Sequence, residues 1–296
     1  MTATLDRTAT TIHSHTTHWH RNGIHVCHAA STGARRFRED WARALERVET
    51  ARFQACRTRH GLSVLHRFDE DELSNELGEL VAAELDVAGL IRGPREFEAV
   101  LLGLIHSIPT AAARPWIPFY RNTIAALESG RASFAPVHQR AARLVSGDEL
   151  LDLGSCFGFF PLRMAATGLS VTAADITSGT VELLGAMATQ LERPLHTLHC
   201  DAADVPRPDR SFDTVTLLHL LEHLPPQKAW TVIAEALRLA RRRVIIAVPF
   251  EPRPRACFGH LQAYDVERLH ALGARTGLDY NVSEHHGGWL VIDQRG

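Results

Sequence analysis

Lysine is almost absent from this chain, since Lys228 is the only one among its 32 lysine and arginine residues. The acidic residues number 34, so the formal net charge is only −2. A chain without excess positive charge has no general attraction to nucleic acid or to an anionic membrane surface. We therefore expect neither nucleic acid nor a membrane among its partners.

Paired cysteines and long apolar runs are also missing. The cysteines are odd in number and show no CxxC spacing: Cys27, Cys56, Cys156, Cys200 and Cys257. This pattern argues against a disulfide framework and suits a reducing cytosol. No apolar run reaches the roughly 18 residues of a membrane-spanning helix, and no secretory signal follows the N-terminus. We expect a soluble, cytoplasmic protein.

The most informative stretch that is present is 149–160, an apolar strand followed by a glycine turn and a helix. Its leucines form the short apolar run that is typical of a strand buried on both faces. Gly154 and Gly158 stand where the backbone must turn tightly and let a ligand come close. Asp175 ends the next predicted strand, and an acid at this place in a βαβ unit can bind the two hydroxyls of a ribose.

The turn does not fit a dinucleotide cofactor. A G-x-G-x-x-G turn needs a bare glycine where this chain has Cys156, and its third glycine is missing too. A cofactor without a pyrophosphate fits the turn better. The alternative is that the stretch belongs to some other α/β protein that merely has a glycine-bearing turn.

The pattern Asp-x-Gly-x-x-x-Gly, with an acid after the second strand, resembles motif I of the class I S-adenosylmethionine (SAM)-dependent methyltransferases. The resemblance implies SAM as the cofactor. In the family, an acid after the third strand binds the adenine amino group, and the next backbone N–H meets the ring. A helix-capping role is the alternative for each acid. The cofactor-binding residues that the resemblance implies are Asp152, Gly154, Ser155, Gly158, Asp175, Ile176, Asp201, Ala202 and His219.

Strands and helices alternate from about residue 147 to the end. The predicted strands are 150–153, 169–174, 195–200, 213–218 and 243–248, followed by two short ones at 280–284 and 288–293. This order predicts an α/β fold whose sheet is mostly parallel, with one antiparallel strand near the C-terminus. It is the Rossmann-like sheet of the class I methyltransferases, which the chain resembles over about 137–293. We assign a SAM-binding methyltransferase domain to 137–296.

The first 136 residues have a different pattern. Residues 1–20 are rich in threonine and histidine and are predicted to be a disordered tail. Residues 21–136 are predicted to form a mainly helical acceptor or lid region. Helices are expected over 35–48, 70–85 and 95–107, and a hairpin around 59–61.

Segment 211–224 resembles the family's motif after the fourth strand, where FDxV opens the strand and LEHL starts a helical turn. The resemblance places His219 at the strand's carboxyl end, close to the methyl group of the cofactor. A hydroxyl acceptor needs a base at that point, and His219 is the first candidate and His260 the second. A histidine that only shapes the acceptor pocket is the alternative.

His219, Glu222 and His223 are three and four residues apart, and such side chains can share one helix face and bind a divalent ion. Some methyltransferases with a related Glu-x-x-Glu-His arrangement bind a metal there and complete the site with a later histidine. Members without a metal also carry Glu-His at this place. We therefore predict no metal, and if a divalent metal binds, the candidate ligands are Glu222, His223 and His260.

The motif at 151–162 is also similar to that of the mycofactocin oligosaccharide methyltransferases of actinobacteria. That resemblance implies methylation of a glucose 2-hydroxyl on the oligosaccharide of a peptide-derived redox cofactor. The predicted function is a SAM-dependent O-methyltransferase, in the EC 2.1.1 class, that acts on a hydroxyl of a sugar or oligosaccharide. The alternatives are a small-molecule quinone or phenol as acceptor, and a SAM-binding module without catalysis.

Overall fold

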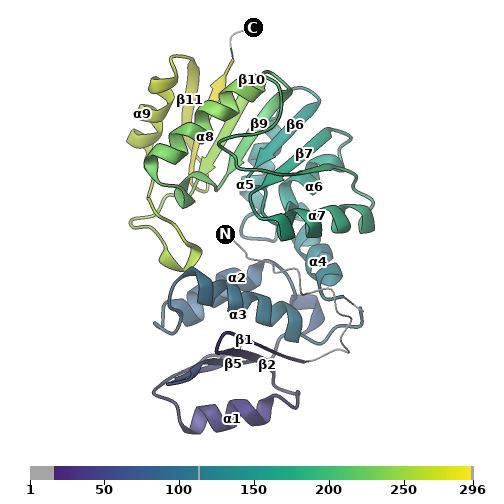
Figure 1. Cartoon of the computed structure of the whole chain (residues 1–296), viewed down its shortest axis with the longest axis vertical. Helices are drawn as coiled ribbons and strands as arrows, with labels where there is room; N and C mark the ends of the chain where they lie inside the picture. The colour runs from purple at the N-terminus through teal and green to yellow at the C-terminus, as the bar shows by residue number, and fades with distance from the viewer. Residues whose placement is uncertain (1–16, 113, 295–296) are drawn as a thin grey trace. The chain divides into compact units, whose positions relative to one another are not determined.

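The structure, a computed structural model, describes residues 17–112 and 114–294 (Figure 1). These residues divide into two compact units. One unit comprises 127–255 and 259–294, and the other comprises 17–126 and 256–258. The predicted division after residue 136 stays a proposal.

The larger unit contains a seven-stranded sheet in the order β8, β7, β6, β9, β10, β12, β11. The strands are β6 (Glu149–Leu153), β7 (Ser170–Asp175), β8 (His196–His199), β9 (Phe212–Leu218), β10 (Ala240–Val248), β11 (Asp279–Glu284) and β12 (Gly288–Asp293). Strands β6 to β10 pair in parallel, whereas β12 runs antiparallel to both β10 and β11. The predicted mostly parallel sheet with an antiparallel strand near the C-terminus is confirmed.

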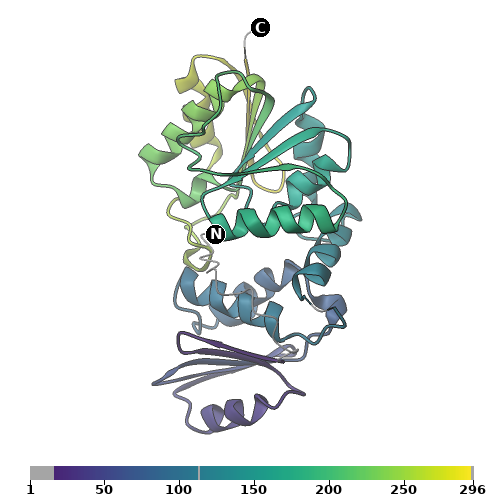
Figure 2. The ribbon, with the colours of Figure 1, turned by 45° about the vertical axis from the view of Figure 1, so that its right-hand side comes forward.

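Helices cover both faces of this sheet, as Figures 1 and 2 show for α8 and α9 on one face and for α5 and α6 on the other. The helices of this unit are α5 (Ala135–Leu144), α6 (Phe159–Ala165), α7 (Ser178–Gln190), the short turn η4 (Leu221–His223), α8 (Pro226–Leu239) and α9 (Val266–Thr276). Side chains alternate between two cores: Leu151 packs with the residues of α8, and its neighbour Leu150 packs with those of α5 and α6. Burial on both faces explains why β6 and the second half of β10 carry apolar residues at consecutive positions.

The smaller unit contains a five-stranded sheet in the order β1, β2, β5, β4, β3. Its elements are β1 (His18–Arg21), β2 (Ile24–His28), α1 (Ala34–Ala42), β3 (Glu46–Glu49), β4 (Phe53–Thr58), β5 (Gly61–His66), η2 (Glu70–Glu72), α2 (Glu76–Val81), η3 (Ala82–Asp86), α3 (Pro94–Ser107), the start of α4 (Trp116–Glu128) and η5 (Ala256–Phe258). The predicted hairpin is confirmed as β4 and β5.

Strands β1, β2 and β3 were not predicted, so the region expected to be mainly helical also contains a sheet. Strands β1 and β3 are short, largely exposed edge strands with no alternation of apolar and polar residues. Two histidines of the predicted tail, His18 and His20, lie in β1. The rest of that predicted tail, 1–16, lies outside the described residues.

Two predicted helices of this unit were too long. The helix expected over 35–48 ends at Ala42, and the chain continues into β3. The helix expected over 70–85 is broken between η2 and α2, where the side chain of Asn122 donates hydrogen bonds to the backbone oxygens of Glu70 and Leu73. A side chain distant in sequence thus replaces the helical hydrogen bonds, which no local pattern could indicate.

Across the described ranges, every helix falls short of the length or the apolarity that crossing a bilayer requires.

Candidate active site

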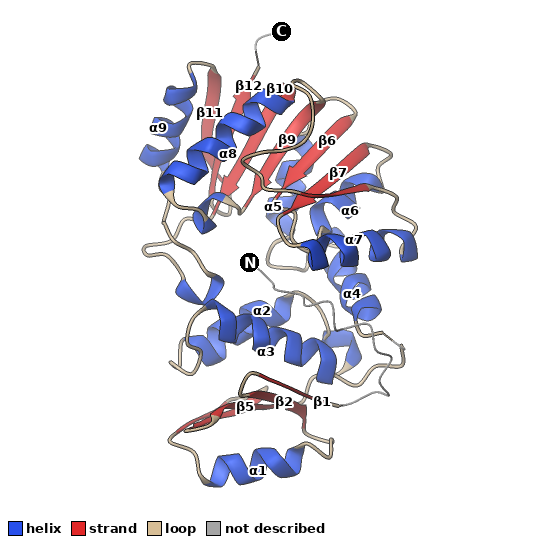
Figure 3. Ribbon diagram, in the orientation of Figure 1, coloured by secondary structure: helices blue, strands red, loops and turns tan. Residues whose placement is uncertain are grey.

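The carboxyl ends of strands β6 to β10 meet at one edge of the large sheet, because these strands run in parallel (Figure 3). In an open α/β sheet the ligand lies beyond this edge. The predicted cofactor residues follow β6, β7, β8 and β9, so the fold brings them to the same side. Gly154 is held against the end of β7, since its backbone N–H donates to the Ala174 oxygen at 2.9 Å.

The glycine turn has little room for side chains. Gly154 and Gly158 have φ angles of +71° and +73°, in the left-handed region that favours glycine. A Cβ added to Gly154 would lie 2.7 Å from Leu220 Cδ1, and one added to Gly158 would lie 2.4 Å from Leu184 Cδ1. Both the backbone conformation and the packing against Leu220 and Leu184 therefore require glycine at these two positions.

Asp175, buried at the end of β7, holds this turn in place. Its Oδ2 accepts a hydrogen bond from the Cys156 N–H at 2.9 Å, and its Oδ1 accepts one from the Thr177 N–H at 2.9 Å. Two carboxylate oxygens offer about four acceptor positions, so capacity remains for the hydroxyls of a ribose. The next residue, Ile176, is an exposed apolar side chain that could contact an adenine ring.

Asp152 lies deeper than the sequence suggested, at 4% exposure near the end of β6. Its Oδ1 accepts a hydrogen bond of 2.5 Å from the Thr216 hydroxyl, which joins β6 to β9. Burial raises the pKa of Asp152 to about 7, and the nearby Asp175 carboxylate adds to the rise. Its predicted contact with the cofactor stays a prediction.

Asp201 already has a partner. Its Oδ2 accepts a hydrogen bond from Lys228 Nζ, on α8, and its Oδ1 accepts one from the Ala203 N–H at 2.9 Å. The Lys228 hydrogen bond lowers the pKa of Asp201. Asp201 and Ala202 are partly exposed, so a ligand can reach both residues. Their role in binding adenine stays a prediction.

His219 follows β9 with a φ of +54°, an unusual conformation for a residue with a side chain. Its ring packs edge-to-face on Phe134 with centroids 4.6 Å apart, and its side chain keeps 22% exposure. Nε2 is buried with no hydrogen-bond partner among the described residues, and Nδ1 lies 3.4 Å from Glu222 Oε1. Burial lowers the pKa of His219 to about 3 and raises that of Glu222 to about 8. His219 is therefore a neutral imidazole at pH 7.

His260, in the segment after β10, forms a pair with Glu251. Its Nδ1 lies 2.7 Å from Glu251 Oε2. Its ring also meets that of His223 edge-to-face, with centroids 4.8 Å apart. Burial lowers the pKa of His223 to about 3. The structure thus brings the two predicted bases, His219 and His260, close to Glu222 and His223. Three of these four residues, Glu222, His223 and His260, are also the candidate metal ligands.

Sequence reasoning missed the groups that support these residues: Phe134, Thr216, Lys228 and the pairing of Glu251 with His260. The only signal for Lys228 was its being the sole lysine of the chain. No local pattern pointed to Phe134, which lies in the loop before α5 and reaches His219 from far along the sequence.

Known methyltransferases are similar to this chain in sequence. Residues 151–248 match the family described as "Methyltransferase domain". The demethylmenaquinone methyltransferase of Clavibacter sepedonicus is 33% identical over 116 residues, which are 39% of this chain and 47% of that protein. The 27-O-demethylrifamycin SV methyltransferase of Amycolatopsis mediterranei (strain S699) is 37% identical over 101 residues, 33% of this chain and 36% of that protein. The chain thus spans less than half the length of either relative.

Among solved structures, the chain is similar to the magnesium protoporphyrin IX methyltransferase of Synechocystis PCC 6803, determined with bound SAM. The sequence identity is 20%, the TM-score is 0.42, and the overlap covers 57% of this chain and 77% of the other.

Proposed function

We propose that this chain transfers the methyl group of SAM to a hydroxyl oxygen of a small molecule. The match of residues 151–248 to the methyltransferase domain family supports this proposal. SAM is the cofactor of the domain and supplies a methyl group on a positively charged sulfur. The protein's part is to hold that group in line with the acceptor oxygen and to accept the proton of the hydroxyl.

The observation that carries the proposal is the position of His219 at the end of β9, beyond which the cofactor is expected. Its buried Nε2 has no hydrogen-bond partner in the described chain, so it can accept a proton from an acceptor hydroxyl. Glu222 Oε1 lies 3.4 Å from Nδ1 on the other side of the ring, where it can orient the imidazole. His260 is the second candidate base.

The step balances without another reactant. The acceptor oxygen forms a bond to the methyl carbon while the carbon–sulfur bond breaks and its electron pair stays on sulfur. The products are the methyl ether and S-adenosylhomocysteine, and the hydroxyl proton passes to His219 and then to solvent.

We propose a sugar or oligosaccharide hydroxyl as the acceptor. Support comes from the resemblance of segment 151–162 to the mycofactocin oligosaccharide methyltransferases, for which a glucose 2-hydroxyl is the acceptor. The name of the Amycolatopsis relative also specifies an oxygen position. Exposed aromatic side chains often stack on sugar rings, and the sequence offers Phe119 and Tyr120 for this role. Both are fully buried in the smaller unit, so they do not support this acceptor.

A quinone or phenol is the second candidate acceptor, and the demethylmenaquinone methyltransferase among the relatives favours it. The same histidine could take the proton of a ring hydroxyl. We also propose a cytosolic location, which agrees with the odd number of cysteines and with their lack of CxxC spacing.

The test is an assay with isotopically labelled SAM, in which glucose oligosaccharides, a demethylmenaquinone analogue and a simple phenol compete in one mixture. We expect label on the oligosaccharide, with the chemical shift of a methyl ether on a sugar carbon. Label on the quinone or phenol alone would exclude the sugar acceptor and leave methyl transfer standing.

Labelled product from none of the three, in a protein that binds SAM by calorimetry, would exclude these acceptor classes. Absence of SAM binding would contradict the proposed function itself.

A further inference from the structure

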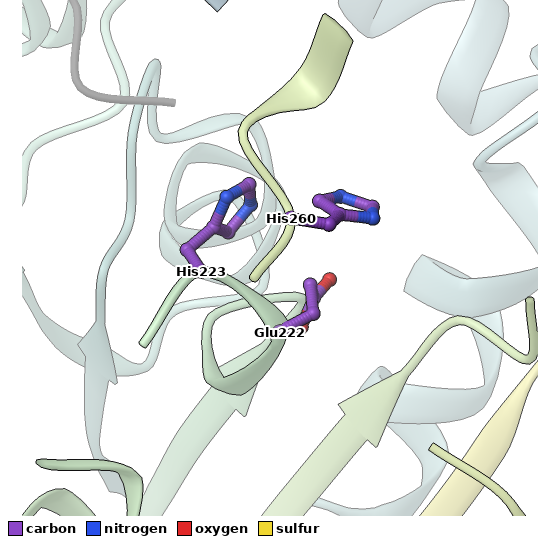
Figure 4. A group of neighbouring side chains, drawn as sticks. All are labelled: Glu222, His223 and His260. Carbon is purple, nitrogen blue, oxygen red and sulfur yellow. The ribbon is translucent and has the colours of Figure 1, made fainter. Parts of the chain in front are cut away.

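We infer that Glu222, His223 and His260 form a binding site for one divalent transition-metal ion, with zinc as the best match. Each residue offers a ligand atom, and the three atoms lie within 4.8 Å of one another. Figure 4 shows the three side chains, two from the turn after β9 and one from the segment after β10.

The strongest evidence is the carboxylate of Glu222. The side chain is only 1% exposed, and neither of its oxygens has a hydrogen-bond partner among the described residues. Its ionisable neighbour His219, whose Nδ1 lies 3.4 Å from Oε1, makes no hydrogen bond to it. A buried carboxyl group without a hydrogen bond is costly, and buried charges in proteins are normally paired or bound to metals. A cation between Glu222 and the two histidines would supply the missing partner.

Each histidine is also held by a second group, as metal-binding histidines almost always are. Glu251 Oε2 lies 2.7 Å from His260 Nδ1, which fixes the ring and directs Nε2 to the other side. The ring of His223 is hydrogen-bonded to the backbone of Gly259. Such outer partners fix the tautomer and the ring orientation of a ligand.

The ligand set selects the ion. Two imidazoles and one carboxylate form a common set of catalytic zinc sites, which keep a further position open. Magnesium and calcium prefer oxygen ligands only. Zinc–nitrogen bonds of about 2.0–2.1 Å place neighbouring ligand atoms roughly 3.4 Å apart. The ligand atoms now lie within 4.8 Å of one another. Rotations of the three side chains would bring them to this shorter distance without a change in the backbone.

An ion here would lie next to His219, whose Nδ1 is 3.4 Å from Glu222. Through its open position it could bind the acceptor oxygen, lower the pKa of the hydroxyl and leave His219 to receive the proton. His260 would then be a ligand rather than a base. This use of the ion rests on the proposed function, whereas the binding of zinc does not.

The experiment is a zinc titration by calorimetry of the full chain, after chelator treatment and removal of the chelator. We expect one tight equivalent. Glu222→Gln keeps the shape of the side chain, and His260→Ala removes a ligand; each should weaken binding by about 100-fold or more. Glu251→Gln should weaken it by about 10–100-fold, the usual cost of changing an outer partner.

Two matched controls address other histidines. His285→Ala with His286→Ala removes an exposed histidine pair, and His13→Ala with His15→Ala removes histidines near the N-terminus. Both should keep the tight equivalent. Circular dichroism and SAM binding verify that each variant is folded.

Zinc binding that is equal in the wild type, Glu222→Gln and His260→Ala would overturn the site, as would no tight equivalent in the wild type. Undiminished methyl transfer in excess chelator would overturn the catalytic use and leave the proposed function intact. Failure of SAM binding would contradict the proposed function without affecting the zinc result.

Discussion

The Asp175 carboxylate accepts a hydrogen bond from the backbone N–H of Cys156 at 2.9 Å, so the end of β7 directly holds the turn that follows β6. Asp175→Ala therefore removes the proposed ribose ligand and also loosens the turn. We expect SAM affinity to fall by about 10–100-fold, since a hydrogen bond to a charged group is worth about 1.5–3 kcal/mol. Calorimetric titration with SAM measures the change.

Asp279→Ala is the control for this prediction, because Asp279 is an exposed acid on β11, in the same unit. It should bind SAM like the wild type. An unchanged affinity in Asp175→Ala would show that the ribose is bound elsewhere.

Gly158 and Gly168 allow backbone strain to be separated from close packing. Their φ angles are +73° and +88°, but a Cβ would meet Leu184 at 2.4 Å in the first case and nothing within 4 Å in the second. Gly168→Ala should lower the free energy of unfolding by about 1–2 kcal/mol, the cost of a left-handed residue. Gly158→Ala should lower the free energy of unfolding by about 1–3 kcal/mol more than Gly168→Ala, because the added methyl group overpacks the site. Urea denaturation of both variants gives the difference, and equal losses would contradict the packing seen around Gly158.

Asp152 should make stability depend on pH. Its pKa is raised from 3.8 to about 7, so the folded protein retains a proton that the unfolded chain releases. The stability that this proton provides is complete below about pH 4 and is lost as the pH rises toward 7. Asp152→Asn has no such proton, yet its side-chain oxygen can still accept from Thr216.

Melting temperatures of wild type and Asp152→Asn, compared from pH 4 to pH 8, measure this effect. The variant should gain stability relative to the wild type as the pH rises to about 7, and the difference should then level off. A difference that stays constant over this range would mean that Asp152 titrates normally.

His219→Ala should slow methyl transfer more than it weakens SAM binding. A positioned base contributes about 100- to 10,000-fold to the rate, so kcat should fall by that order while SAM affinity changes little. His196→Ala, an exposed histidine on β8, is the control. Undiminished turnover in His219→Ala would remove it as the base.

The sheet of the larger unit could be predicted because its signals are local. Leu150 and Leu151 are apolar at consecutive positions because both faces of β6 are buried, and turn residues separate each strand from the next helix. The same regularity placed Asp175 and His219 at one edge, since parallel strands end together.

What could not be predicted depends on contacts between distant residues. Asn122 interrupts a helix that the pattern around Leu73 predicted to be continuous. The pairing of Asp201 with Lys228 needs β8 and α8 to be neighbours, which only the folded chain shows. Whether Glu222 has a partner is likewise a property of its surroundings and leaves no mark in the motif.

The smaller unit is discontinuous, since it includes Ala256–Phe258 from far down the chain. The ring of Phe258 meets that of Phe97, a residue with 1% exposure, edge-to-face at 5.0 Å. During synthesis, the ribosome must therefore complete the strands through β10 before this unit obtains its last piece. A fragment cut at residue 126 would leave Phe97 without that cover, so the two units cannot be separated by a single cut in the gene.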